Sequence, residues 1–369
     1  MEVFSIEDRQ AICDTFSRLL GDMADEQRLR EVIETESGFD AELWEKMSEL
    51  GLMGIMIAPE HGGIGGSIVE AEALMEQAGE YLYNGPFIST CVIAATILSS
   101  CDNDELKSSH LAGITEGTAI FSVAGCGKKG DWSQPPEVQA EESAEGWRLT
   151  GTSGFVSHAA VANHCLVYAN TDAGTGVFLV NMADSGAEIV PHTTDDTTLR
   201  LSSLDFNEVN AQRLTGVGEE VIQDAFQNAL VALAGEQVGG ARKIFEITID
   251  YMKTRHQFGQ PIGNFQALKH MAADLLIELE SASSAARHSA RSLATDGDDH
   301  KQMAFLAGFS CADNFRKIAA KSIQLHGGIA YTMEHPAHLY WRRAQTGQWL
   351  YCSSDSLRDM YLSEVEKML

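Results

Sequence analysis

Basic residues are scarce in this sequence. Lysine and arginine together number 26 against 53 aspartates and glutamates in 369 residues, so the formal net charge is -27. A field of that sign repels nucleic acid and anionic membrane surfaces, which argues against either as a partner. It also repels an anionic cofactor, so any phosphate-binding site has to be built locally from arginines and helix N-termini.

Long apolar runs and a secretory leader pattern are missing as well. No uninterrupted apolar stretch approaches the ~18 residues of a membrane span, and residues 1–8 have neither a basic start nor an apolar core. The seven cysteines form no C-x-x-C pair, and their odd number excludes complete pairing within the chain. These features predict reduced thiols and a cytoplasmic protein.

What is present is ordinary globular composition, arranged in three blocks. Hydrophobic residues make up 44% and charged residues 21%, which predicts a folded chain. Apolar residues recur at helical spacing through residues 1–116, the alternation of strands fills 117–216, and helical spacing returns over 217–369. Because helices and strands are segregated in this way, we predict an α+β fold of three domains rather than a Rossmann fold.

Two local patterns refine this organisation. The glycine-rich run PEHGGIGG at 59–66 has neither a strand-to-helix G-x-G-x-x-G frame nor a P-loop lysine, so we expect a tight turn there. The last block should contain long amphipathic helices over residues 219–254, 262–295, 300–327 and 337–368. Helices of this length and pattern are typical of a bundle.

Two motifs in the last block point to a bound phosphate group. The run RHQFGQP at 255–261 ends a helix, and the planar guanidinium of Arg255 can hydrogen-bond two phosphate oxygens at once. The run QLHGGIAY at 324–331 places Gly327 and Gly328 in a helical region, where a glycine costs about 1 kcal/mol relative to alanine. Close approach of a ligand to the backbone explains these glycines, and a plain helix terminus is the alternative for both motifs.

Together the two motifs resemble the flavin-contacting signatures of the acyl-CoA dehydrogenase family, and the resemblance covers nearly the whole chain. It implies an N-terminal helical domain, a middle antiparallel β domain and a C-terminal four-helix bundle. It also implies FAD as the cofactor, bound mainly by a neighbouring subunit. The residues that would contact this FAD are Arg255, Phe258, Gln324, Gly327 and Gly328.

The segments that hold the flavin ring in that family are altered here. An aromatic-x-Val-Thr-Glu-Pro run usually opens the β domain, whereas this chain has FSVAGCGKKG at 121–130. A Trp-x-Thr run usually follows the first hairpin, and its weaker equivalents here are Phe155, as a stacking ring, and Ser157, as one hydroxyl. The alternative is that both segments are ordinary strands.

The resemblance also implies a glutamate as general base, which removes the proton α to a thioester carbonyl. Tyr351 stands at the usual position, and a tyrosine with a reference pKa of about 10 is a poor base. Some family members place the glutamate on the earlier helix, where Glu236 lies among small and apolar residues that would raise its pKa. We therefore predict Glu236 as the catalytic residue, with Asp355 and Glu334 as weaker alternatives.

The activity that the resemblance implies is FAD-dependent dehydrogenation of an acyl-CoA thioester to the trans-2-enoyl-CoA, with an electron-transfer flavoprotein as acceptor. Because one half of the shared cofactor site is kept and the other is altered, we predict an α2β2 heterotetramer with a homologous sister subunit. Its substrate would carry a bulky acyl chain such as a steroid side chain. A homotetramer, a non-catalytic scaffold subunit, and a flavin monooxygenase or oxidase on the same fold are the alternatives.

A metal centre is not among the predictions. His335 and His338 stand close together, but no carboxylate and histidine spacing around them demands a metal ion. We expect both to be surface or packing residues.

Overall fold

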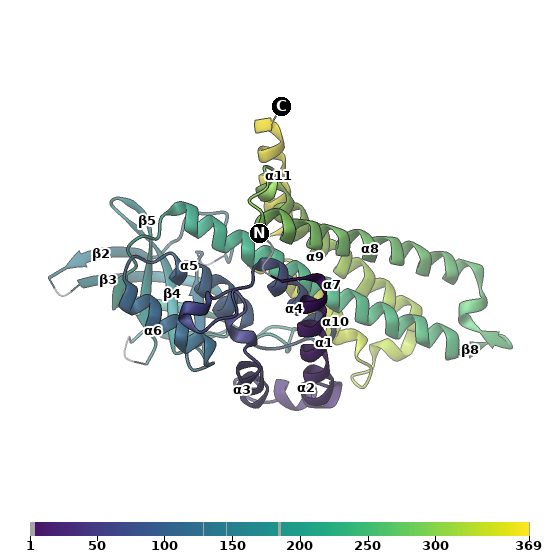
Figure 1. Ribbon diagram of the computed structural model, residues 1–369. Coiled ribbons are helices and arrows are strands. Elements are labelled where there is room, and N and C mark those ends of the chain that lie inside the picture. Colours follow the sequence, from purple (N-terminus) through teal and green to yellow (C-terminus); the bar gives the residue numbers. More distant parts are fainter. Residues whose placement is uncertain (1–3, 128, 145, 184–185, 369) are drawn as a thin grey trace.

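The computed structural model describes residues 4–127, 129–144, 146–183 and 186–368. Helices form its N-terminal part, strands its middle and helices again its C-terminal part. The strands stand at one end of the long helices, and the first helices of the chain, drawn in purple, lie at the lower centre of the view (Figure 1). This arrangement confirms the predicted α+β fold class.

The N-terminal part is built from helices with well-formed caps. Ser5 accepts a hydrogen bond from the Asp8 backbone while the Asp8 carboxylate accepts one from Ser5, and Ser67 and Glu70 form the same reciprocal cap on a later helix. The elements are α1 (Ile6–Met23), α2 (Glu26–Ile33), α3 (Ala41–Glu49), η1 (Leu52–Gly54), η2 (Pro59–His61), α4 (Ile68–Glu80), η3 (Ile88–Ala94), α5 (Ala95–Ser99) and α6 (Asp104–Thr115).

The glycine-rich run at 59–66 is the tight turn that the sequence predicts. Gly66 N donates to Ile55 O at 2.8 Å, so the chain doubles back on itself. A Cβ on Gly63 would lie 2.0 Å from Ile57 O, which leaves no space for a side chain. These glycines therefore serve close packing of the backbone.

The middle part is a seven-stranded sheet that closes on itself, because β5 pairs both with β4 and with β7. Its strands are β1 (Phe121–Ala124), β2 (Gln139–Ser143), β3 (Gly146–Ser157), β4 (His164–Thr171), β5 (Gly174–Asn181), β6 (Glu188–Pro191) and β7 (Leu201–Arg213). Most neighbours are antiparallel, and β1 runs parallel to β4. The short strand β6, largely exposed, is not foreseen from the sequence.

The C-terminal part is a bundle of long helices. Its elements are α7 (Glu219–Thr254), β8 (His256–Gln257), β9 (Gln260–Pro261), η4 (Ile262–Asn264), α8 (Gln266–Ala294), α9 (His300–His326), η5 (Gly327–Tyr331), α10 (Ala337–Gly347) and α11 (Ser354–Met368). The helix expected at 337–368 is two helices, because residues 348–353 leave the helical conformation and Tyr351 adopts φ +66°. None of the helices in the described ranges has the length and apolar character of a membrane span.

Helices α4 and α7 cross at very close range, which joins the N-terminal and C-terminal parts. A Cβ on Gly79 would lie 2.0 Å from Glu236 O, and one on Gly239 would lie 1.8 Å from Glu76 O. Only glycines permit backbones this close. The largest hydrophobic cluster also spans the parts, with Leu74 of α4 in the same core as residues of β4 and α7.

Candidate functional site

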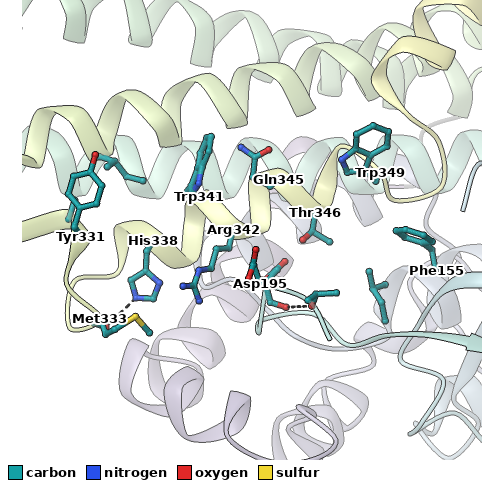
Figure 2. Close-up of a pocket in the computed structure, with 15 residues that line it drawn as sticks. Phe155, Asp195, Tyr331, Met333, His338, Trp341, Arg342, Gln345, Thr346 and Trp349 are labelled. Atoms are coloured by element: carbon teal, nitrogen blue, oxygen red, sulfur yellow. Dashed lines mark hydrogen bonds between the residues drawn. The ribbon is translucent and has the colours of Figure 1, made fainter. Parts of the chain in front are cut away.

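A cleft of about 670 Å³ lies between the β sheet and α10 (Figure 2). Phe155 and Trp349 stand at one end of this cleft, and Tyr331 and Met333 stand at the other. Arg342 projects into its middle from α10. A cleft of this size, with aromatic walls and a few polar groups, is typical of a site for a small molecule or cofactor.

The residues of the first motif lie at the end of the bundle farthest from the β sheet (Figure 1). Arg255 is the C-cap of α7, and its side chain is exposed. Phe258 follows in the turn between β8 and β9, with φ +54° and 90% of its surface exposed. A ring so exposed gains almost nothing from burial inside this chain, which favours contact with a ligand or another subunit.

The residues of the second motif follow at the end of α9. Gln324 is exposed on the last turn of the helix, and Gly327 then adopts φ +68°, a conformation that side chains disfavour. A Cβ on Gly327 or on Gly328 would meet no atom within 4 Å. These glycines therefore do not serve packing within the chain, in contrast to those of the turn at 59–66.

These exposed groups fit one end of an FAD molecule. The fork of Arg255 suits phosphate oxygens, and bare backbone at Gly327 and Gly328 lets a pyrophosphate approach closely. Phe258 and Gln324 would border the same ligand. Their roles as cofactor contacts stay predictions, and the open space over the two glycines is the observation that favours them.

Glu236, the predicted base, lies in the middle of α7 and faces a cavity of about 30 Å³. Its Oε1 lies 2.9 Å from Nε of Arg343, an ion pair in which the N–H is not aligned for a hydrogen bond. Burial raises the pKa of Glu236, Arg343 opposes that shift, and the nearby Asp196 carboxylate adds to it. The pKa direction is the one expected from the sequence, but the arginine partner is not foreseen.

Arg343 itself is one of the most deeply buried charges of the described chain, with 3% of its surface exposed. Its Nη1 donates to Thr198 O at 2.9 Å, and its Nη2 donates to Tyr83 O. The guanidinium thus connects α10 to the β domain, to the N-terminal helices and to Glu236 on α7. Such a network stabilises the junction of the three parts only if every member is present.

The cavity beside Glu236 has space for about one water molecule. Ser157, His158 and Tyr351 form other parts of its wall. His158 is buried with both ring nitrogens unpartnered among the described residues, and burial lowers its pKa to about 3. Tyr351 stands at the position predicted for a glutamate, and burial raises its pKa, so it stays a neutral phenol. The arrangement has no space for an acyl chain.

A row of aromatic rings fills the space next to this cavity. The ring of Trp132 lies 5.0 Å from that of Tyr351, 5.4 Å from that of Tyr168 and 6.2 Å from that of Phe226, and Phe226 in turn contacts Phe305. Phe305 lines a separate cavity of about 480 Å³. The rings therefore stand between the cavity at Glu236 and a larger space that opens beside α11.

The loop that carries Trp132 is fastened to the C-terminal part. Trp132 N donates to Tyr351 O at 2.7 Å, and the Asp131 carboxylate accepts from Ser356 Oγ at 3.0 Å and from Cys352 Sγ at 3.4 Å. Burial alone would raise the pKa of Asp131. The hydrogen bonds from Ser133, Ser356 and Cys352 outweigh that effect, so the pKa lies below its usual value. The loop after β1 is thus held in place where the family's flavin-holding run is altered.

The same loop covers one side of Phe155. A Cβ on Gly130 would lie 2.6 Å from the Phe155 ring, and Gly130 has φ +78°. Phe155 itself has φ +53° beside a register shift in the β3–β7 pairing, and His158 just past β3 has φ +56°. Non-glycine residues with such φ values collect at binding and active sites. Phe155 still keeps 37% of its surface exposed and borders the cleft between the β sheet and α10.

The weaker candidates for the catalytic base, and the two histidines considered as metal ligands, lie away from Glu236. Asp355 is in the first turn of α11 and pairs with Arg358 at the surface, and Glu334 is exposed. The ring of His335 meets the ring of the buried His326 edge to face, with the ring centroids 4.4 Å apart, so it packs against another side chain. Within the described ranges, no group of three metal-ligating side chains is close enough to hold a metal ion.

The residues that sequence reasoning missed are Trp132 and Arg343. The only local signal is that Arg343 occupies a position on the buried face of α10. A buried arginine implies a buried partner, but the sequence does not identify that partner. Trp132 gives no signal, because it lies in an irregular loop and its partners are distant in sequence.

Comparison with known proteins places this architecture. Residues 6–118 match the acyl-CoA dehydrogenase N-terminal domain, and residues 216–364 match the acyl-CoA dehydrogenase C-terminal domain. The chain is 30% identical over 324 residues to the acyl-CoA dehydrogenase FadE27 of Mycobacterium tuberculosis, covering 86% of each. It is 30% identical over 340 residues to the acyl-CoA dehydrogenase IpdE2 of Mycolicibacterium smegmatis, covering 92% of each.

Solved structures agree with these matches. The ChsE4-ChsE5 complex from Mycobacterium tuberculosis superimposes with a TM-score of 0.91 at 26% identity, covering 100% of this chain and 99% of that one. A steroid ACAD variant named Tcur3481-Tcur3483 gives a TM-score of 0.89 at 27% identity, covering 98% of both chains. The chain therefore belongs to the FAD-dependent acyl-CoA dehydrogenase family.

Proposed function

We propose that this chain is one subunit of a heteromeric acyl-CoA dehydrogenase and completes an FAD site whose flavin-ring side is supplied by a homologous sister chain. The assembly would convert an acyl-CoA thioester into the trans-2-enoyl-CoA. The bound FAD would supply the hydride acceptor for that oxidation. This chain's own residues would hold the far end of the cofactor and stabilise the assembly.

The observation that carries the proposal is a difference between the two ends of the long helices, the one farthest from the β domain and the one beside it. At the far end of the bundle, Gly327 and Gly328 face open space and Phe258 is almost fully exposed. At the β domain, the Trp132 loop packs against Phe155 and Tyr351, and about 30 Å³ is left beside Glu236. The far end is open to a ligand, whereas little space remains beside Glu236 itself.

The same geometry bears on the catalytic base. Glu236 as base stays a prediction, and its ion pair with Arg343 and the small volume beside it speak against that role in this chain. A base has to reach the proton that it removes to within hydrogen-bonding distance. We therefore place the glutamate that performs this step on the sister chain, and Glu236 in the junction between α7 and α10.

The relatives support the heteromeric assembly and the substrate class. One similar structure is a complex of two differently named chains, ChsE4 and ChsE5, and another is described as a steroid ACAD. We extend both descriptions to this chain and propose a bulky acyl chain, such as a steroid side chain, on the CoA ester. An electron-transfer flavoprotein is proposed as acceptor, and the unpaired cysteines are in keeping with a cytoplasmic location.

Flavin stoichiometry tests the proposal. The chain is purified alone and together with co-expressed acyl-CoA dehydrogenase homologues from the same genome, and bound FAD is measured by absorbance after denaturation. We expect a nearly colourless isolated chain and a yellow complex that holds about one FAD for each pair of chains. A yellow, active homotetramer with one FAD per chain would refute the proposal.

The variant Glu236→Gln, made in the assembled complex, then separates catalysis from support. Turnover of an acyl-CoA substrate should change less than threefold, while thermal stability falls. A loss of turnover by several hundredfold with FAD content unchanged would restore Glu236 as the base. Complete inactivity of every complex, with flavin bound, would favour a scaffold role for the whole assembly.

A further inference from the structure

A third cavity lies away from the cleft and from the Trp132 loop. It measures about 290 Å³ and is enclosed by one face each of α1, α4 and α8. Its polar lining consists chiefly of Arg9 and Cys13, Glu72 and Glu76, and Arg287 and Arg291. The apolar part of the wall includes Val69 and Ala73. Nothing in the proposed flavin chemistry uses these residues.

Helix α4 carries three buried glutamates, and two of them are accounted for. Glu70 caps its own helix and pairs with Arg9 at 2.9 Å. Glu76 accepts hydrogen bonds from Arg242 at 2.9 Å and from a second arginine on α8. Glutamates are rarely buried without such partners, because the charged form loses its hydration.

Glu72 is the exception. It is 3% exposed, and its Oε1 has no hydrogen-bond partner among the described residues. Its side chain lines the cavity. Oε1 is shielded from solvent by the protein, so a molecule in the cavity would reach this carboxyl group through its other oxygen.

Two of the cations around the cavity, Arg287 and Arg291, are exposed to solvent. Arg287 and Arg291 stand four residues apart on α8, where like charges repel each other. Arg287 shares Glu76 with Arg242. The guanidinium of Arg291 makes no hydrogen bond or ion pair within the described ranges, although it borders the cavity. A negative group between the two arginines would relieve the repulsion.

The protonation states make the cavity locally positive within a strongly acidic chain. Burial first, and the neighbouring Glu76 second, raise the pKa of Glu72 to about 8, while Arg287, Arg9 and Arg291 oppose the shift. Glu72 is then mostly an uncharged acid at pH 7, with an O–H that can donate. Burial raises the pKa of the Cys13 thiol to about 11, so that thiol adds no negative charge.

We propose that the cavity between α1, α4 and α8 binds a small organic carboxylate. The carboxylate would accept hydrogen bonds from Arg291 and Arg287 on one side and from the Glu72 acid group on the other. Its short apolar body would lie against Val69 and Ala73. A volume of about 290 Å³ admits a group the size of a short-chain or aromatic acid and excludes a whole coenzyme.

The carboxylate can come from either of two sources. One is a free organic acid, and the other is an Asp, Glu or C-terminal carboxylate of an adjoining subunit. Both present the same two oxygens to the arginine fork. Binding to the isolated chain and to the assembled complex distinguishes them, because a subunit's carboxylate would occupy the cavity only in the complex.

Isothermal titration calorimetry with sodium butyrate and sodium benzoate tests the proposal, with butyramide as the uncharged isostere and sodium chloride at matched ionic strength. At pH 7 the isolated chain should bind at least one of the acids saturably and should not bind butyramide. Affinity should fall roughly tenfold per pH unit above 8, where Glu72 loses its proton.

Variants then assign the binding to this cavity. Arg291→Gln should weaken binding at least tenfold, whereas Arg316→Gln, at an exposed arginine of α9, should leave it unchanged. Glu72→Gln keeps a donor, so binding at pH 7 should persist within about threefold and the fall above pH 8 should disappear. These variants need not affect flavin content, so the result is independent of the proposed function.

The complex decides the source. If the acid binds both the isolated chain and the assembled complex, the natural ligand is a free acid. If it binds only the isolated chain, and Arg291→Gln weakens the complex at least tenfold, the natural ligand is a carboxylate of the adjoining subunit. The proposal is overturned if neither acid binds the isolated chain, or if Arg291→Gln leaves the binding there unchanged.

Discussion

At the scale of single residues, the chemistry of Glu236 is set by Arg343, which lies more than a hundred positions away. The two groups form an ion pair in the interior, where an isolated charge would be strongly disfavoured. A carboxylate held in this way has its charge balanced and its position fixed. A glutamate with a raised pKa is therefore not by itself evidence for a catalytic base, because its ion-pair partner determines whether it can accept a proton from a substrate.

Removal of Arg343 should destabilise the chain more than removal of the pair. Arg343→Met leaves Glu236 buried without its cation and frees Thr198 O and Tyr83 O, for an expected loss of about 3 to 5 kcal/mol. The double variant Glu236→Gln/Arg343→Met should recover part of that loss. Urea unfolding of the wild type, both single variants and the double variant gives the coupling energy, and strictly additive effects would contradict a functional pair.

Glu72 should make stability depend on pH. Its pKa of about 8 in the folded chain lies above the usual glutamate value of 4.5, so the folded chain keeps a proton that the unfolded chain loses. Stability therefore falls as pH rises from about 4.5 to about 8 and levels off above that. Glu72→Gln should be roughly neutral at pH 4.5 and stabilising by about 3 to 5 kcal/mol at pH 8.

Thermal unfolding of Glu72→Gln and the wild type between pH 5 and pH 8 measures this difference. Glu70→Gln serves as the matched comparison on the same helix, because Glu70 is engaged with Arg9 and with the helix cap. That variant should be destabilising throughout. Parallel pH profiles for wild type and Glu72→Gln would show that Glu72 is not the titrating group.

Several residue-scale features could be inferred from the sequence, and others could not. The end of a helix at Arg255 follows from Gly259 and Pro261 close behind it, and the burial of Glu236 follows from its small, apolar neighbours. The positions of Trp132 and Arg343 depend on contacts between segments more than a hundred residues apart. Local periodicity carries no information about such contacts.

At the scale of elements, the loop between β1 and β2 packs against the sheet and the helices as a helix would. Its Trp132 contacts rings from β4, α7 and the break between α10 and α11. Glycines make the fit possible, since a Cβ on Gly125 would lie 2.7 Å from the Trp132 ring. An irregular segment can therefore be as strongly specified as a helix.

Truncation of Trp132 should measure how much this loop contributes. Trp132→Ala leaves a void among the surrounding rings, and the expected loss is about 2 to 4 kcal/mol, slightly below that for a fully buried tryptophan. Trp132→Phe should retain most of the stability. Denaturant titration followed by circular dichroism checks both, and equal losses for the two variants would indicate that the indole hydrogen-bonding edge matters more than ring packing.

Glycines on two helical elements give opposite predictions. Gly239→Ala places a Cβ 1.8 Å from Glu76 O and should separate α4 from α7, at a loss of at least about 3 kcal/mol. Gly328→Ala meets open space and should leave thermal stability within about 0.5 kcal/mol. In the complex with the sister chain, Gly328→Ala should lower FAD content, and unchanged FAD content would remove Gly328 from the cofactor site.

Element boundaries differ in how visible they are in the sequence. The bounds of α7, Glu219–Thr254, follow from a long helical period that ends at a glycine and a proline. The break at 348–353 is hidden, because that stretch contains neither residue and its conformation is held by contacts with the Trp132 loop. Tertiary packing overrides local propensity at this point.

At the scale of the whole molecule, several large apolar side chains face solvent. Besides Phe258, exposed residues include Ile277 on α8 and Tyr331 and Met333 after α9. Scattered apolar residues on a surface are normal, but a set of this size on one helical bundle indicates surfaces that are covered in an assembly. The net charge of -27 keeps the isolated chain from aggregating in the meantime.

Assembly should therefore change the exposed apolar surface measurably. Binding of the dye ANS, which reports accessible hydrophobic surface, should be at least twofold higher for the isolated chain than for the same chain in the complex. Phe258→Ser should lower the signal of the isolated chain and weaken the complex, whereas Leu50→Ser, at an exposed apolar residue of the N-terminal part, should leave the complex intact. Equal dye binding before and after assembly would argue against burial of these residues.

The hydrogen bonds between Asp131 and the segment 352–356 have a consequence for biosynthesis. Cys352 lies 221 residues beyond Asp131, so a ribosome that adds about 5 to 20 residues per second needs roughly 10 to 45 s to deliver it. During that interval Trp132 has Tyr168 beside it but lacks its contacts with Tyr351. A product that stops before residues 351–356 would therefore leave the Trp132 ring in an open aromatic pocket.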